Sequence, residues 1–205
     1  MYGLIACIAL VFLSVEFLDR PIARFVHAQS RVQPGVAQDI LDAMSRIPEI
    51  LGGLAILLII GLGLLRLVLG RLSGLAETGF LAALSTVVAE PIKTALKLAC
   101  GRTWPETWLH DNFSYIRDGV YGFFPFHGGT GWASFPSGHT TVACAFMAVL
   151  WLLRPRWRPL YALVVAASML GLLGMNYHFL TDIIAGAYLG GAVGVATVRI
   201  GSKAS

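Results

Sequence analysis

Two histidines and an aspartate occur at spacings that suit the transfer of a phosphoryl group. His178 and Asp182 are four residues apart, so their side chains share one face if the segment is helical. A carboxylate that is hydrogen-bonded to one imidazole nitrogen fixes the tautomer and makes the other nitrogen a better nucleophile or base. His139, in a separate polar cluster, supplies a second group that can give or take a proton.

The run Pro-Ser-Gly-His that ends at His139 predicts the start of a helix, with Ser137 or Thr140 as its cap. A helix N-terminus presents free backbone N–H groups and a partial positive charge, so it is a suitable place for a phosphate. Lys97 and Arg102, in a third polar cluster, add positive charge that would attract an anion. Together these parts predict phosphoryl transfer through a histidine.

The elements that position these residues are predicted to be membrane helices. Hydrophobic residues make up 57% of the 205-residue chain and charged residues 13%, whereas soluble domains contain about 25% charged residues. Such a composition excludes a disordered chain and an ordinary soluble domain and is typical of a polytopic membrane protein. The net charge of +4 does not indicate a nucleic-acid partner, because no dense basic stripe occurs outside the predicted loops. We therefore expect one all-α, membrane-embedded domain over residues 1–205.

Six apolar stretches predict a bundle of six transmembrane helices. They cover residues 4–18, 50–69, 80–100, 141–153, 160–179 and 183–198. Several are shorter than the roughly 20 residues that a helix needs to cross the hydrocarbon, so their polar ends must belong to the helices. The three polar clusters fall at ends of the third, fourth and fifth stretches that face the same side of the membrane. Antiparallel packing would bring them together, although each cluster alone also has a structural explanation, such as capping or snorkelling.

The distribution of basic residues predicts how the bundle is oriented. One face carries seven basic residues and one acidic residue, Glu77. The basic residues are Arg66, Arg71, Arg154, Arg156, Arg158, Arg199 and Lys203. Because short loops rich in Lys and Arg stay in the cytoplasm, we expect a multi-pass protein of the cell (inner) membrane with both termini cytoplasmic. Residues 19–49 and 101–136, and with them the candidate site, would lie on the outer, periplasmic face.

Each of the two outer segments has a distinctive pattern. Val36, Ile40, Met44 and Ile47 recur at helical spacing, which predicts a helix that lies in the membrane interface or packs on the bundle as a lid. Residues 101–135 form a long segment rich in aromatic side chains, which favour the headgroup level of a membrane. We expect an outer aromatic loop that anchors the protein in the interface or guides a lipid to the site.

The three clusters resemble the signature of the phosphatidic acid phosphatase type 2 superfamily of membrane lipid phosphatases. That signature has three parts: a Lys, any six residues and Arg-Pro; Pro-Ser-Gly-His; and Ser-Arg, any five residues, a His, any three residues and an Asp. Residues 135–140 match the second part in full, and His178 and Asp182 keep the spacing of the third. The resemblance implies a six-helix fold with the active site near one membrane face.

The resemblance also implies roles for individual residues. His178 would attack phosphorus and form a phosphohistidine, and Asp182 would orient and polarise it. His139 would protonate the leaving oxygen, while Ser137 and the backbone of Gly138 would bind phosphate oxygens. The family needs no metal ion, so we expect no metal and no cofactor, and a phosphorylated membrane lipid as the substrate.

The chain departs from the signature at both of its arginines. Trp104 stands where the first part has Arg, seven residues after Lys97. Leu172 stands at the arginine of the third part, and Gly171 replaces the serine before it. Loss of both arginines removes much of the charge that would stabilise a phosphate, unless other groups compensate.

Three other cations are candidates to compensate for the missing arginines. Arg102 lies two residues before Trp104 and follows a helix that already carries Lys97, so a small shift could point it into the same pocket. The planar fork of an arginine can also grip two phosphate oxygens. We therefore expect Arg102 to bind phosphate, with Lys93 and Arg117 as further candidates.

The resulting hypothesis is a metal-independent lipid phosphate or lipid pyrophosphate phosphatase. Bacterial members of the family act on undecaprenyl pyrophosphate, phosphatidylglycerol phosphate, phosphatidic acid or lipid A, and the sequence does not choose among them. Alternatives are a lipid phosphotransferase that uses the same phosphohistidine and a lipid-binding relative with weakened catalysis. A metal site is a further alternative, although its residues show no known ligand spacing. Its ligands would be His110, His127, His139 and His178.

Overall fold

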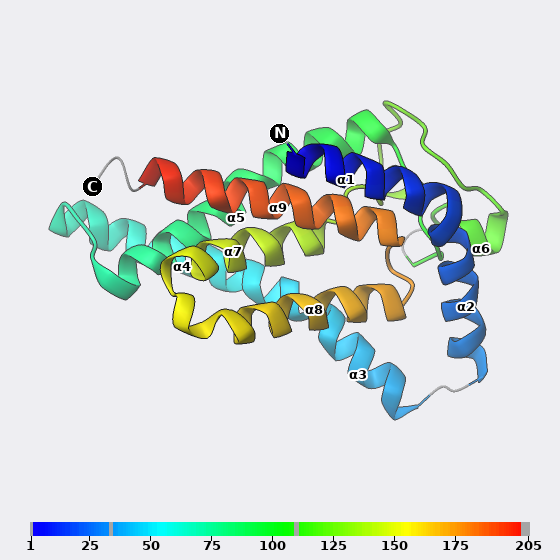
Figure 1. Cartoon of the computed structure of the whole chain (residues 1–205), viewed down its shortest axis with the longest axis horizontal. Helices are drawn as coiled ribbons and strands as arrows, with labels where there is room; N and C mark the ends of the chain where they lie inside the picture. Colours follow the sequence, from blue (N-terminus) through cyan, green and yellow to red (C-terminus); the bar gives the residue numbers. More distant parts are fainter. Residues whose placement is uncertain (1, 33–34, 109–110, 202–205) are drawn as a thin grey trace.

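The computed structural model of the protein is a bundle of helices (Figure 1). It describes residues 2–32, 35–108 and 111–201. The α helices are α1 (Tyr2–Leu13), α2 (Asp19–Val32), α3 (Val36–Ser45), α4 (Ile47–Leu69), α5 (Gly74–Cys100), α6 (Tyr115–Asp118), α7 (Gly138–Leu153), α8 (Arg158–Gly174) and α9 (Leu180–Gly201). The shorter helical turns are the π-helical η1 (Ser14–Leu18) and the 3₁₀ turns η2 (Thr130–Trp132) and η3 (Pro155–Trp157). Within the described ranges, β interactions occur as isolated bridges and not as strands, so the predicted all-α class is confirmed.

Five helical segments of the described chain are long and apolar enough to cross a membrane. They are Tyr2–Ser30, Val36–Leu69, Gly74–Cys100, Pro155–Gly174 and Leu180–Gly201. The remaining predicted span corresponds to α7, which is apolar but has 16 residues. α7 packs against α4, α5, α8 and α9, so protein instead of lipid surrounds much of this short helix. The chain is therefore a multi-pass membrane protein, as its composition predicts.

The contact between α7 and α9 sets the distance between two of the polar clusters. At Gly186, a Cβ atom would lie 2.6 Å from the carbonyl oxygen of Ser137. At Gly190, a Cβ atom would lie 2.3 Å from the carbonyl oxygen of Thr141. Small residues allow this close approach of two membrane helices. The contact holds the start of α9, which carries Asp182, against the start of α7, which carries His139.

The segment between the first two spans differs from the prediction. The sequence predicts one helix within residues 19–49, whereas the structure contains two, α2 and α3. α2 turns away from α1 at the π-helical segment η1 (Figure 1). Pro21 is compatible with the start of α2, because the first helical turn does not need its backbone N–H. The prediction missed α2, although Ile22, Phe25 and Val26 recur there at helical spacing.

α3 packs on the bundle as a lid over the end of α8. At Gly171 of α8, a Cβ atom would lie 2.4 Å from the backbone nitrogen of Ser45 and 2.7 Å from the carbonyl oxygen of Leu41. The lid alternative for this helix is therefore confirmed. Val36 and Ile40 of the same helix are exposed, which leaves an apolar side free to lie in the membrane interface.

The aromatic loop between α5 and α7 folds back over the end of α5. The chain turns at Gly101, which adopts a left-handed conformation with φ = 54°. A Cβ atom at this position would lie 1.8 Å from the carbonyl oxygen of Phe124, so only glycine fits. Within the loop, the ring of Trp132 lies 4.6 Å from that of Phe124 and 5.0 Å from that of His127, measured between centroids. The loop thus has an ordered aromatic core.

We expect this loop to face the outside of the cell, as the basic bias of the opposite end predicts. The test starts from a variant whose cysteines, Cys7, Cys100 and Cys144, are replaced by serine. A cysteine introduced at Gly128, which is exposed, should react with a membrane-impermeant thiol reagent in spheroplasts. A cysteine at the exposed Pro155 should react only after lysis. The opposite labelling pattern would mean that the orientation is inverted.

Candidate active site

A cavity of about 410 Å³ contains both predicted histidines. Its walls come from the α3–α4 junction, the aromatic loop, the first turn of α7, and α8 with the connection to α9. The ring centroids of His139 and His178 lie 6.2 Å apart. A larger cavity of about 1040 Å³ is lined by α5, α9 and the turn between α4 and α5. Its described lining includes none of the three polar clusters, so the smaller cavity is the candidate site.

His178 lies in the turn before α9 and not within a helix, which differs from the helical spacing expected from the sequence. Asp182 nevertheless reaches it from the first turn of α9. Its Oδ2 accepts a hydrogen bond from the backbone N–H of Phe179 at 3.0 Å and lies 3.4 Å from Nδ1 of His178. The carboxylate therefore meets the imidazole by capping the start of α9.

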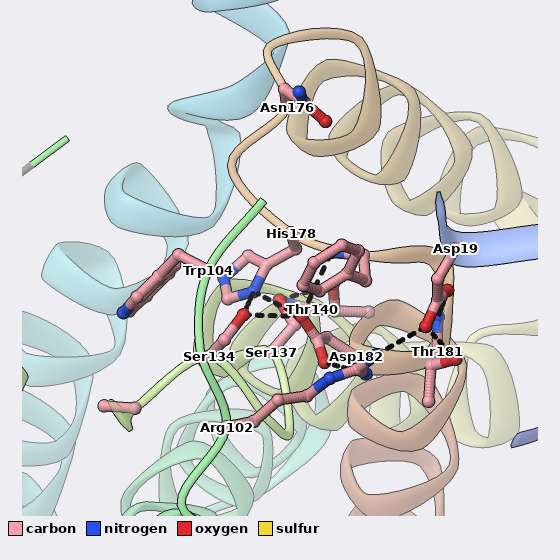
Figure 2. A network of polar contacts seen from close by, with 12 residues as sticks. Asp19, Arg102, Trp104, Ser134, Ser137, Thr140, Asn176, His178, Thr181 and Asp182 are labelled. Atoms are coloured by element: carbon pink, nitrogen blue, oxygen red, sulfur yellow. Dashed lines mark hydrogen bonds and ion pairs between the residues drawn. The ribbon is translucent and has the colours of Figure 1, made fainter. Parts of the chain in front are cut away.

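Ser134 is a third member of this group (Figure 2). Its hydroxyl donates to Oδ2 of Asp182 at 2.6 Å and lies 3.4 Å from Nδ1 of His178. Because Nδ1 faces these oxygens, Nε2 is the nitrogen left for a substrate. Trp104 packs beside the imidazole, with 5.1 Å between ring centroids, and its indole N–H donates to the carbonyl of Thr130 at 2.7 Å. Ser134 was not predicted, although it directly precedes the matched run 135–140.

Arg102 is fully buried between two carboxylates (Figure 2). Its Nη1 lies 2.7 Å from Oδ1 of Asp182, and its Nη2 lies 2.6 Å from Oδ2 of Asp19. The guanidinium also packs against the rings of Phe123 and Phe179, at 4.7 and 4.5 Å from their centroids. The structure therefore corrects the expectation that Arg102 takes over a phosphate contact. Its charge is used inside the protein, where it holds Asp182 in place.

Asp19 anchors this network from the first span and was not predicted. Its Oδ1 accepts a hydrogen bond from the backbone N–H of Thr181 at 3.0 Å, and its Oδ2 accepts one from the Thr181 hydroxyl at 2.7 Å. The hydroxyl of Tyr121 also lies 3.2 Å from Oδ2. A buried carboxylate is tolerated when such partners surround it. The available signal was an acidic residue directly after an apolar span, a position at which charge often marks function.

The start of α7 has the predicted capping geometry. Oγ of Ser137 accepts a hydrogen bond from the backbone N–H of Thr140 at 3.3 Å, and the Ser137 N–H donates to the carbonyl oxygen of Asp182 at 2.9 Å. Ser137 is buried, and its hydroxyl caps the N-terminus of α7. Gly138 lies beside Lys93, because a Cβ atom there would be 3.3 Å from Nζ of that lysine. Backbone N–H groups and a nearby ammonium thus surround the first turn of α7.

The two other predicted cations have protein partners. Nζ of Lys97 donates to the carbonyl oxygen of Ala133, and its charge acts on both His139 and His178. Arg117 forms exposed ion pairs with two aspartates of its own loop, at 2.6 and 2.9 Å. Lys97 therefore belongs to the electrostatic surroundings of the site, whereas Arg117 belongs to the loop.

Burial lowers the pKa of His178 to about 4, although the Asp182 carboxylate opposes this shift. His178 is thus neutral at physiological pH, the state in which a ring nitrogen can act as a nucleophile. Burial also disfavours the charge of Arg102, but Asp182 and Asp19 outweigh it and raise its pKa. The site therefore combines a neutral imidazole with a charged arginine.

Among the residues that the structure describes, no group of three or more His, Cys, Asp or Glu side chains is arranged to hold a metal ion. His127 packs against the rings of Phe124 and Trp132. Nε2 of His139 lies 3.5 Å from Oε1 of Glu49. His110 lies outside the described residues. The geometry therefore gives no support to the four-histidine alternative.

We expect His178 to titrate near pH 4 in the folded protein. The unfolded chain should show the ordinary histidine pKa of about 6.5. The unfolded state then binds more protons between these values, so the free energy of unfolding should fall as the pH drops from about 6.5 towards 4. NMR of ¹⁵N-histidine-labelled protein in detergent, assigned with a His178→Asn variant, measures the midpoint. A midpoint near the ordinary value would contradict the burial argument.

Arg102→Ala should lower the free energy of unfolding by about 3–5 kcal/mol, because it leaves two buried carboxylates without their cation. Thermal unfolding in detergent measures this change. Arg117→Ala, which breaks exposed pairs, is the control and should lower the free energy of unfolding much less. Asp19→Asn should also move the ¹⁵N signal of His178 if Arg102 acts by positioning Asp182. An Asp19→Asn protein with an unchanged signal would argue against that positioning role.

Two proteins of named activity are similar in sequence to part of this chain. Lipid A 1-phosphatases from Rhizobium etli and Rhizobium johnstonii are 37% and 39% identical to this chain over 107 and 97 residues. These matches cover 51% and 46% of this chain, but 42% and 36% of the relatives, so the chain spans less than half the length of these proteins.

A solved structure shares the fold over nearly its whole length. This structure is of a transmembrane PAP2 type phosphatidylglycerolphosphate phosphatase from Bacillus subtilis, which aligns with a TM-score of 0.63 and 14% identity. The alignment covers 100% of this chain and 98% of the Bacillus protein. The family profile described as PAP2 superfamily matches residues 78–205, which include both histidines and Asp182. With more than half of its length matched in this way, the chain belongs to the PAP2 superfamily.

Proposed function

We propose that this protein is a phosphatase that removes a phosphate group from a membrane lipid through a phosphohistidine on His178. The observation that carries the proposal is the neutral, buried His178, held at Nδ1 by Asp182 and Ser134 beside His139. The proposed steps use side chains for both the nucleophile and the proton donor, so they call for no metal ion and no cofactor. The catalytic unit would be the single domain 1–205.

In the first proposed step, Nε2 of His178 attacks phosphorus, and the bond between phosphorus and the lipid oxygen breaks. His139 donates a proton to that oxygen, so the lipid leaves as an alcohol, or as a monophosphate if the substrate is a pyrophosphate. In the second step, water attacks the phosphohistidine while His139 accepts a proton. The N–P bond breaks and inorganic phosphate leaves. Asp182 stabilises the positive ring of His178 while that bond exists.

The phosphate group would be held at the start of α7. The backbone N–H of Gly138 and its neighbours in the first turn are suited to phosphate oxygens. Ser137 supports this site by capping the helix, and its bond to the Asp182 carbonyl fixes α7 relative to the nucleophile. Lys97 supplies positive charge from α5.

As the substrate we propose a phosphorylated glycolipid of the lipid A 1-phosphate type. The names of the two rhizobial relatives support this choice. The cavity wall supports it as well, because Trp104, Trp108 and Tyr177 offer aromatic faces for a sugar ring. Thr130 adds a polar group that can bind a hydroxyl. The site would open to the outer leaflet of the inner membrane.

Purified protein in detergent should release inorganic phosphate from lipid A 1-phosphate in the presence of a chelator. Release should be slower from phosphatidylglycerol phosphate, phosphatidic acid and undecaprenyl pyrophosphate. His178→Ala should reduce release by at least about 1000-fold, because the nucleophile is lost. Rapid acid-free quenching with labelled substrate should trap phosphate on the wild-type protein and not on the variant.

Each alternative predicts a different result in this assay. An active His178→Ala protein of unchanged thermal stability would refute the histidine mechanism. Transfer of the label to a second lipid without free phosphate would identify a phosphotransferase. Lipid binding without any turnover would identify a non-catalytic relative, and faster release from another lipid would correct the proposed substrate.

A further inference from the structure

Both positions at which the family signature carries an arginine hold uncharged residues here, Trp104 and Leu172. Arg102 cannot replace them, because Asp19 and Asp182 enclose its guanidinium inside the protein. A phosphate that reacts in a cavity with little water needs positive groups aimed at its oxygens. A positive group beyond Lys97 would therefore have to come from another element that borders the cavity.

The lid helix α3 occupies the space next to Leu172. Gly171 replaces the serine of the signature, and a Cβ atom there would lie 2.4 Å from the backbone nitrogen of Ser45. The carbonyl oxygen of Leu41 would be 2.7 Å away. Because these are backbone atoms, a larger residue at position 171 would force α3 away from α8. Gly171 thus allows the C-terminal end of α3 to reach the cavity.

Arg46, at that end of α3, lines the cavity together with Leu172, His139 and His178. Its Nε and Nη2 lie 3.0 and 2.8 Å from Oδ2 of Asp42, so the carboxylate holds one edge of the guanidinium. Nη1 makes no hydrogen bond to any residue that the structure describes, and 64% of the side chain is exposed. An arginine has five N–H donors, so this one keeps donors for an anion.

We propose that Arg46 binds the phosphate group of the substrate. It would take the place of the arginine in the third part of the signature, where this chain has Leu172. This role rests on the proposed phosphatase function. This proposal gives one explanation for both departures from the signature, at positions 171 and 172. Glycine at 171 admits α3, and leucine at 172 leaves the cavity free of a second guanidinium. The positive charge comes from the lid instead of from α8.

The other cations near the site are less exposed than Arg46. Among the described residues that line the cavity, Arg46 is the only Lys or Arg. Lys93 lies 2.7 Å from Glu90, and its side chain is 15% exposed. Lys97 donates to the carbonyl of Ala133. Lys93 is therefore the rival that the experiment must include.

The test measures phosphate binding separately from turnover. Inorganic phosphate, the proposed product, should raise the Tm of the wild-type protein in detergent, because a ligand of the folded state stabilises it. Arg46→Ala should lose most of this rise, and its kcat/KM on the lipid substrate should fall by about 100-fold. Arg46→Lys should keep part of both, because lysine offers one point charge and no planar fork. Arg156→Ala, an exposed arginine of η3, is the matched control and should behave like the wild type.

A second variant tests the part played by the glycine. Gly171→Ser restores the signature residue but displaces the backbone of Ser45, so it should weaken the phosphate-dependent rise in Tm although Arg46 is present. In the Arg46→Ala background, the same change should have little further effect on phosphate binding, because the two residues act through one contact. Additive losses would contradict this coupling.

The inference is overturned if Arg46→Ala keeps the wild-type kcat/KM and the wild-type rise in Tm, or if the wild-type protein shows no rise. A loss confined to Lys93→Met would assign the contact to Lys93 instead. A wild-type protein that releases no phosphate from any lipid refutes the proposed function. The phosphate-dependent Tm of Arg46→Ala still decides the role of Arg46 in that case.

Discussion

The buried ion triad of Arg102, Asp19 and Asp182 is the interaction on which the rest of the site depends. A guanidinium with no exposed surface is stable only if carboxylates neutralise it, and removal of either partner leaves a charge that the protein interior cannot solvate. The triad joins the first span, the loop after α5 and the start of α9. Because Asp182 also contacts Nδ1 of His178, the orientation of the imidazole follows from this charge balance.

Close backbone packing gives the triad a rigid support. The glycine contacts between α9 and α7 fix the two helices at their polar ends, and the N–H of Ser137 bonds directly to the carbonyl oxygen of Asp182. The helix end proposed to bind phosphate and the start of α9, next to the proposed nucleophile His178, are thus joined by backbone atoms, which move less than side chains. Functional groups mounted in this way keep their geometry without the help of a bound ligand.

The sequence was sufficient for the parts of the site that depend on local spacing. His178 and Asp182 were found from their four-residue spacing, His139 was found from the Pro-Ser-Gly-His run, and the spans follow from hydropathy. Asp19 and Arg46 were missed because they reach the site from segments that lie more than 130 residues from His178 along the chain. Such contacts arise from tertiary packing, and the one local sign was that the acidic Asp19 directly follows an apolar span.

Arg102 was assigned to phosphate because it is adjacent to a motif position, yet the turn at Gly101 directs the chain back across the bundle. Arg102 and Trp104 are two residues apart in the chain that follows. Trp104 packs on the imidazole of His178, whereas Arg102 pairs with Asp182, which lies below that imidazole in Figure 2. Their proximity in the sequence alone could not show that Trp104 lies beside the imidazole of His178 and that Arg102 pairs with the carboxylate of Asp182.

The enclosure of Arg102 also bears on how this chain can evolve. The region matched by the family profile begins at residue 78, so it contains Arg102 and Asp182 but not Asp19. A neutral residue at position 19 would leave surplus positive charge in the interior, and a neutral residue at position 102 would leave two acids facing each other. Single replacements at either position are therefore disfavoured. Homologues that keep an arginine at position 102 should inherit an acidic residue at the end of the first span with it.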